Sequence, residues 1–146
     1  MLFRSAKDNE VDLKVNAAMV AAGTIKASTE IYEQRLLITG LIDDKATYDK
    51  LLKGVRGVSG IKKLYWHVLY ASPAEQKAKN LISWEQALLI EEKAKARLIG
   101  TLDVHDINYR VAVDTSATVY VLGRAKSEPE HQRALARLLA DRKSVV

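Results

Sequence analysis

The residues whose types could do chemistry are few and stand far apart along this sequence. The histidines His67, His105 and His131 lack the close spacing of metal ligands on one element, and the chain contains no cysteine. Ser83 and Ser127 each precede a Gln or Glu by three residues, which is the pattern of a helix capping box rather than of a nucleophile. The sequence therefore predicts no catalytic residue, no metal site and no cofactor.

Neighbouring carboxylates are the other groups that could act as acid and base. Glu91 and Glu92 lie beside Lys93 and Lys95 in a segment with helical periodicity. Mixed charges in this order are typical of a solvated helix face. We therefore expect these side chains in water, and not across a cleft where they could do acid–base chemistry.

A nucleic-acid clamp is a further possibility, because Arg56 lies inside the Gly-x-x-Gly step from Gly54 to Gly57. A KH domain holds an RNA backbone with such a loop between two helices. Here the sequence continues through Gly60 into a predicted strand instead of a helix. We favour helix termination at these glycines and keep KH-like RNA binding as a third hypothesis.

Trp84 is the most informative single residue. It falls in the first turn of a predicted helix, with Leu88 on the same face and Lys77 and Lys79 just upstream. An indole entering a membrane interface, with lysines near anionic headgroups, predicts phospholipid binding by these four residues. The alternative, equally supported, is that Trp84 packs against the neighbouring domain or sheet.

A second aromatic group occupies one predicted strand. Tyr65, Trp66 and Tyr70 form a possible interaction surface, although packing is the favoured role for Trp66. A three-stranded sheet with both helices on one face leaves its other face open. Some of these aromatic side chains must therefore be exposed or face the second half of the chain.

The composition bounds the kind of protein. The 146 residues are 48% hydrophobic and 28% charged, which is typical of a folded globular chain. The net charge of +5 is spread along the sequence, so it favours anionic partners but gives no dense nucleic-acid footprint. No apolar run is long enough for a transmembrane helix.

Five elements are expected over residues 10–70. A helix ends near Gly23, and two strands flank a polar turn at residues 33–35. A second helix, capped by Asp43 or Asp44, ends in the glycines of residues 54–60, and an aromatic-rich strand covers residues 61–70. The buried stripes of the two helices are predicted to be Val11, Val15, Ala18, Met19 and Ala22, and then Tyr48, Leu51, Leu52 and Val55.

The same order begins again after a linker at residues 71–82. A helix starts at Ser83 and stops near Gly100, strands follow at residues 107–113 and 118–123, and a last helix starts at Ser127. The chain ends where the final strand would begin. The stripes here are Ala87, Ile90, Ala94 and Leu98, and then Ala134, Leu135, Leu138 and Leu139.

Internal duplication explains this repetition most simply. The strand motifs Leu36–Gly40 (LLITG) and Val119–Gly123 (VYVLG) match in pattern and position, and Gly60–Leu64 (GIKKL) leads into the last strand of the first copy. In this order the motifs resemble a pair of BON (bacterial OsmY and nodulation) domains over nearly all of residues 10–140. Two hairpin turns depart from the family pattern, because Glu33-Gln34 and Thr115-Ser116 stand where a glycine is common.

The resemblance implies an α+β fold of two tandem αββαβ domains, residues 10–70 and 83–140. Each would be a small mixed three-stranded sheet with two helices on one face, the second lacking its last strand. It also implies a non-enzymatic envelope protein, periplasmic or tethered to the outer membrane as a lipoprotein, that supports envelope integrity. Its expected partner is an anionic phospholipid surface; the alternative is an envelope protein bound without lipid affinity, and no nucleic acid is expected.

We expect the two ends of the chain to be foreign. Residues 1–5 and 141–146 match, in frame, the translation of a common short-read sequencing adapter. On this hypothesis the natural segment runs from Ala6 to Ala140, and the missing signal region says nothing about localisation.

Overall fold

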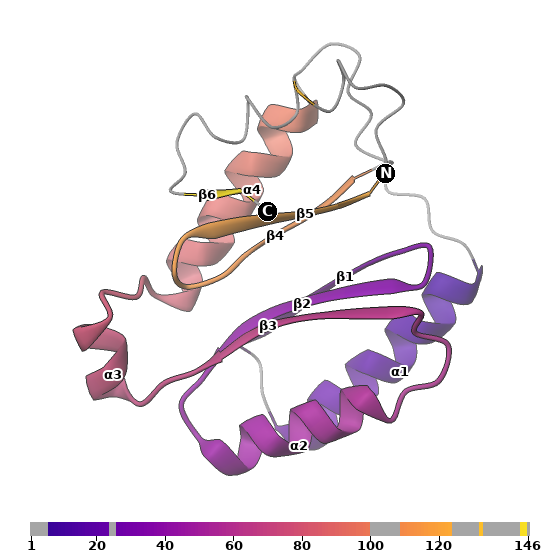
Figure 1. The fold of residues 1–146 in the computed structure, drawn as a ribbon, viewed down its shortest axis with the longest axis horizontal. Coiled ribbons are helices and arrows are strands. Elements are labelled where there is room, and N and C mark those ends of the chain that lie inside the picture. The colour runs from indigo at the N-terminus through magenta and orange to yellow at the C-terminus, as the bar shows by residue number, and fades with distance from the viewer. Residues whose placement is uncertain (1–5, 24–25, 100–108, 124–131, 133–143, 146) are drawn as a thin grey trace.

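The computed structural model describes residues 6–23, 26–99, 109–123, 132 and 144–145. The fold is α+β, with two small sheets that lie face to face between helices (Figure 1). The first sheet contains β1 (Ala27–Tyr32), β2 (Arg35–Ile42) and β3 (Lys63–Tyr70), in that order. The second contains β4 (Tyr109–Val113), β5 (Thr118–Gly123) and β6 (Ser144–Val145).

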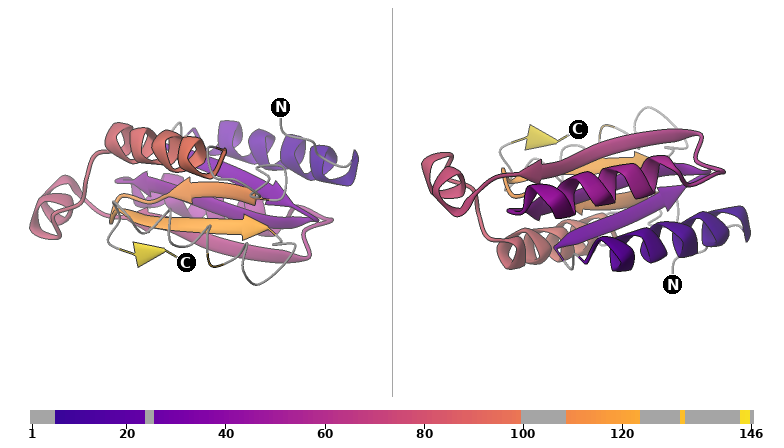
Figure 2. Two further views of the ribbon diagram at one scale, coloured as in Figure 1. Left: turned by 90° about the horizontal axis from the view of Figure 1, so that it is seen from above. Right: turned by 90° about the horizontal axis from the view of Figure 1, so that it is seen from below.

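One face of the first sheet is covered by α1 (Ala6–Ala22) and α2 (Lys45–Arg56), which lie side by side (Figure 2). The predicted helical stripes supply this core, and the N-cap of α2 is Asp44, whose carboxylate accepts from the Thr47 amide. At Gly23, φ is +82°, the left-handed value that ends a helix. The buried core residues are Val11, Val15, Ala22, Ile31, Leu36, Ile38, Ile42, Leu51, Val55 and Val68.

The hairpin between β1 and β2 turns without glycine because Asp8 holds it. Glu33 and Gln34 both have positive φ, 50° and 62°, as a tight two-residue turn requires. Their amides donate to the Asp8 carboxylate at 3.0 and 2.7 Å. Asp8 is buried, so these bonds satisfy its charge and offset the cost of the left-handed backbone.

In the second half, α4 (Trp84–Ile99) packs on the outer face of β4 and β5. The predicted capping box is present, with Ser83 and Gln86 exchanging side-chain bonds to each other's amides. The buried core here is Trp84, Ala87, Ala94, Tyr109, Val111, Val113 and Val119. The expected roles of Gly100 and of the last helix from Ser127 fall outside the described residues.

The two halves share strand order and pairing sense. In each sheet the first two strands are antiparallel and the third is parallel to the second. The first residue of each hairpin faces the motif glycine, since Ala27 pairs with Gly40 and Tyr109 pairs with Gly123. The alignment of the two strand motifs therefore holds in three dimensions.

The second half differs from the sequence expectations in one respect and adds an element to them in another. The linker at residues 71–82 contains a short helix, α3 (Pro73–Ala78), which Ser72 and Glu75 cap reciprocally. The last strand is not missing, because β6 pairs in parallel with β5 through Ser144 and Val145. The sequence pattern did not indicate α3, because a helix of six residues is too short to show a periodic apolar stripe.

The glycine of the first strand motif has a steric reason. The Leu41 amide donates to the Lys26 carbonyl at 2.9 Å, which brings this backbone against Gly40. A Cβ on Gly40 would lie 2.7 Å from that carbonyl oxygen. Only glycine at this position lets the backbone that precedes β1 approach β2 so closely.

The inner faces of the two sheets pack on each other (Figure 1), and the contacts between them are concentrated at β1 and β4. Every residue of β4 and all but the first of β2 are buried, because alternate residues face the helices and the opposite sheet. Among the described residues no helix is long and apolar enough to cross a membrane.

Gly40→Ala is expected to lower the free energy of unfolding by about 1–3 kcal/mol, because the new methyl group must displace the Lys26 carbonyl. Gly57→Ala is the matched control: its Cβ would meet backbone atoms at an ordinary 3.5 Å, so a change of about 0.5 kcal/mol or less is expected. Urea denaturation measures both. Equal effects would contradict the steric account.

Candidate functional site

A polar layer lies between the two sheets, and Arg110 of β4 is its centre. Arg110 is only 2% exposed. Its Nε donates to the Ile31 carbonyl of β1 at 3.2 Å, its Nη1 donates to the Tyr109 carbonyl at 3.1 Å, and its guanidinium lies 5.3 Å from the Tyr32 ring centroid. A buried guanidinium needs such partners, so this residue joins the two sheets at a defined register.

An ion cluster lies at the side of this layer. Lys95 of α4 lies 3.4 Å from the Glu30 carboxylate of β1 and 3.3 Å from that of Glu91. Burial raises the pKa of the Glu91 carboxyl, and both carboxylates raise the pKa of Lys95 despite its desolvation. The expectation that Glu91 is solvated was wrong, because its side chain faces the ion cluster, whereas Glu92 is exposed.

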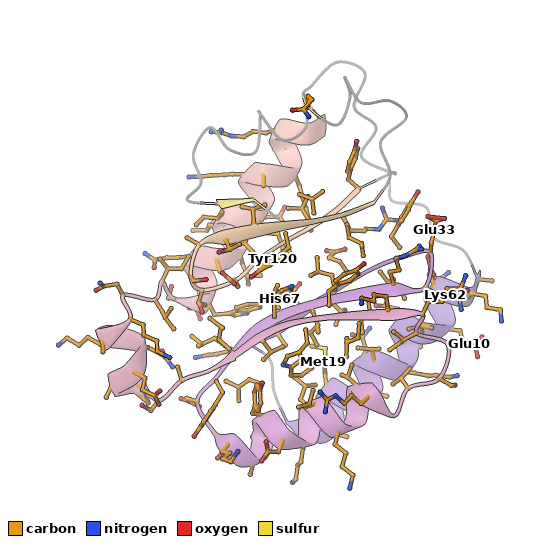
Figure 3. All side chains as sticks on the ribbon, viewed as in Figure 1. Glu10, Met19, Glu33, Lys62, His67 and Tyr120 are labelled. Atoms are coloured by element: carbon orange, nitrogen blue, oxygen red, sulfur yellow. The ribbon has the colours of Figure 1, made fainter. Side chains whose placement is uncertain are left out.

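An aromatic pair joins the sheets on the opposite side of the layer. The His67 ring of β3 stacks on the Tyr120 ring of β5, with centroids 3.9 Å apart and planes 22° apart (Figure 3). The Tyr120 hydroxyl donates to Asp114 Oδ2 at 2.8 Å. The other Asp114 oxygen accepts from the Ser116 hydroxyl and from the Ser116 and Thr118 amides, so this carboxylate also organises the second hairpin turn.

Burial sets the protonation of this pair. Desolvation lowers the pKa of His67, while the Asp114 charge opposes that shift. Burial, followed by the hydrogen bond to Asp114, raises the pKa of the Tyr120 hydroxyl. Near neutral pH both rings are therefore uncharged and stack as apolar surfaces.

An open cavity of about 270 Å³ lies beside the stack, between β3 and β5. It is lined by Leu37, Tyr65, His67, Tyr120, Val121, Leu122 and Gly123. The lining mixes aromatic rings and aliphatic side chains. It therefore suits a planar apolar group rather than a metal or a phosphate.

The free edge of β3 runs along this cavity. Because β3 ends the strand order of its sheet, one side of its backbone has no strand partner among the described residues. Lys62 and Lys63 are exposed at its start, and Lys45 lies 5.9 Å from the Tyr70 ring at its end. An unpaired edge with such flanking cations can accept an extended chain.

The structure assigns Trp84 to the core, contrary to the predicted lipid contact. Its side chain is 6% exposed and packs with Ala87, Tyr109 and Val111. Packing against the sheet, the alternative weighed from sequence, accounts for this indole. Leu88, at 37% exposed, lies on the surface of α4, and Lys77 and Lys79 are exposed at α3.

The three aromatic residues of the possible interaction surface point in different directions. Tyr65 lines the cavity. Trp66 lies on the helical side, where its Nε1 donates to the Tyr48 hydroxyl at 3.1 Å, so its favoured packing role is confirmed. Tyr70 is 41% exposed, with its ring 5.7 Å from that of Tyr48.

Gly57 and Gly60 follow the end of a helix, as predicted, whereas Gly54 was wrongly predicted to end it and lies inside α2. The helix α2 stops at Arg56, and turns lead directly into β3 without a second helix. A Cβ on Gly54 would lie 3.2 Å from that of Ala18, so this glycine lets α1 and α2 pack closely. The KH-type clamp therefore lacks its second helix.

The part of the chain that the structure describes contains no candidate metal site. No group of three His, Asp or Glu side chains there is arranged to hold an ion. His67 stands in the aromatic stack, and His105 and His131 fall outside the described residues.

Sequence reasoning missed Arg110, Tyr120 and Asp114 as site residues. Arg110 and Asp114 occupy the polar positions of an alternating strand, which predicts exposure to solvent. A second sheet covers those positions instead. One signal was available in the sequence. Each half was predicted to have a sheet with one open face, and such a face must be covered by other residues.

Comparison with known proteins gives little likeness. No protein-family model matches the chain, and no curated protein matches it. Two solved structures of CdsD, a structural protein of the type III secretion system of Chlamydia trachomatis, share 11% identity at a TM-score of 0.37. The first match covers 88% of this chain but only 53% of that one, and the second, a C-terminal domain, covers 99% and 96%. Likeness at this level carries no argument about function.

Stability is expected to fall as the pH drops below the ordinary histidine value near 6.5, because the pKa of folded His67 is lower. The unfolded chain then binds more protons than the folded one, so folding loses free energy as the pH falls toward the folded pKa and keeps it fully above 6.5. His67→Phe keeps a stacking ring without the titration. Urea denaturation at pH 7.5 and about 5.5 should show a smaller acid loss for the variant; identical pH dependence would contradict this role.

Proposed function

We propose that this chain is a non-enzymatic adaptor of the bacterial envelope, built from two BON-like units, that binds an extended segment of a partner protein along β3. One observation carries the proposal: β3 stands at the edge of its sheet beside an open cavity. The inner sheet faces cover each other, so they offer no surface to a partner. The edge remains as the surface for recognition.

The two-unit assignment draws on the shared pairing of the halves. Both repeat an antiparallel hairpin followed by a parallel strand, with the motif glycine opposite the first hairpin residue. The resemblance to BON domains then supplies the envelope setting, periplasmic or tethered to the outer membrane.

The mechanism is strand addition. A partner segment in extended conformation pairs with the free backbone groups of β3 and extends the first sheet. Main-chain hydrogen bonds give affinity, and alternate side chains of the added strand face the cavity or the solvent.

Anionic phospholipid binding is the second candidate. Lys77 and Lys79 are exposed at α3, and Leu88 is partly exposed on α4. Lysines near an anionic surface contribute about 1 kcal/mol each, and this attraction weakens with salt. In this lipid-binding candidate Trp84 remains in the protein core and does not insert into the membrane.

Photo-cross-linking tests the edge. A benzophenone amino acid replaces Lys63 on β3 in one variant and Lys53 on the exposed side of α2 in the control. After incubation with solubilised envelope proteins of a Gram-negative bacterium, the Lys63 position should give discrete adducts several-fold more abundant than the Lys53 position. Equal labelling at both positions contradicts binding at β3.

Vesicle co-sedimentation separates the two candidates. Strand addition predicts little sedimentation with phosphatidylglycerol vesicles at low salt. Strong sedimentation that the double variant Lys77→Glu/Lys79→Glu abolishes, and that Lys50→Glu/Lys53→Glu leaves intact, favours the lipid candidate instead.

A further inference from the structure

We propose that the cavity between β3 and β5 holds one aromatic side chain of an acidic, extended partner segment. The inference rests on the proposed strand addition at β3 and gives the chemistry of the partner. Its basis is the size and lining of the cavity, its position beside the edge, and the charge around it.

The size of the cavity fits one side chain. Its volume of about 270 Å³ lies below the range of about 300–1,000 Å³ usual for drug-sized ligands and cofactors. Tyr65 and the stacked pair of His67 and Tyr120 supply ring surfaces, and Leu37 and Leu122 supply aliphatic contacts. An inserted ring can stack or pack edge to face with these rings, which adds to the free energy gained from its burial.

The position of the cavity matches strand addition. Tyr65 and His67 are two residues apart on β3, so both point to the same face of the first sheet. A side chain on the same face of an added strand lies next to them, as cross-strand neighbours do. One residue of the partner therefore enters the cavity while its backbone pairs with β3.

The charge around the edge selects an acidic partner. Residues 60–70 contain Lys62 and Lys63 and no acidic residue. The Lys63 ammonium lies 6.0 Å from the Tyr65 ring centroid, directly beside the cavity lining. The Asp114 carboxylate is engaged by four hydrogen bonds from neutral donors, and its charge still acts on His67. The acidic residues of the partner are therefore expected at the Lys62 and Lys63 end of the edge, away from Asp114.

Fluorescence anisotropy with designed peptides tests the inference on the full chain. The probe is a fluorescein-labelled nine-residue peptide of alternating Thr and Val, with Trp at its centre and two Asp at one end. A second peptide carries the two Asp at the other end, because strand direction is open. At least one of the two should bind, and replacing its Trp by Ala should weaken binding at least tenfold.

Variants of the chain separate the two parts of the recognition. Lys62→Glu/Lys63→Glu should weaken the acidic peptide at least tenfold, whereas Lys50→Glu/Lys53→Glu, the same charge change on α2, should have little effect. Leu122→Trp fills the cavity and should remove the preference for Trp over Ala in the peptide. Thermal unfolding verifies that this variant is folded before it is used.

The outcomes distinguish this inference from the proposed function. Binding that is indifferent to the peptide Trp overturns the aromatic anchor, and binding indifferent to Lys62 and Lys63 overturns the acidic preference. If no peptide binds while photo-cross-linking at Lys63 still yields its adducts, this inference fails and strand addition stands. If the Lys63 adducts are absent as well, both fail.

Discussion

The structure depends on one constraint: among the described residues each small sheet is covered by helix on one face, and the other face must be covered as well. Here the two bare faces cover each other. The layer between them contains apolar side chains such as Leu37 and Leu41, but it also holds polar contacts. Arg110 is bonded to the Ile31 carbonyl, Lys95 lies between two carboxylates, and His67 stacks on Tyr120. Polar contacts of this kind define a register more strictly than apolar packing does, because a shifted sheet would leave buried charges without partners.

This constraint determines where function can reside. A chain segment as short as residues 6–70 buries too little surface to be stable by a wide margin, so the contact with the second sheet supplies core that it lacks. It also removes the sheet faces from use as binding surfaces. The sheets approach closely at β1 and β4, and a cavity remains at β3 and β5. We therefore propose that a partner protein binds at the β3 edge.

Local patterns predicted most of the fold. Helical stripes such as Val11, Val15 and Leu51, the capping box of Ser83 and the two strand motifs all lie where the sequence indicates, because each depends on neighbours within a few residues. The positions that failed depend on contacts between the halves or on short elements. The sequence predicts that Glu91 and Arg110 are solvated, but contacts with the first sheet bury both. The sequence also allows Trp84 to be a surface anchor, but it packs against β4. Periodicity reports which face is apolar and cannot report what covers a polar face.

Engineered cysteines test the face-to-face packing most directly, since the chain contains none of its own. His67→Cys with Tyr120→Cys replaces two rings whose centroids are 3.9 Å apart, and His67→Cys with Lys50→Cys pairs the same site with the exposed side of α2. A short thiol-to-thiol cross-linker, which does not need the strict Cβ spacing of a disulfide, should link the first pair within one molecule of a dilute sample, and it should not link the second pair. A first pair that stays unlinked, or that links only between molecules, would contradict the packing of the two sheets on each other.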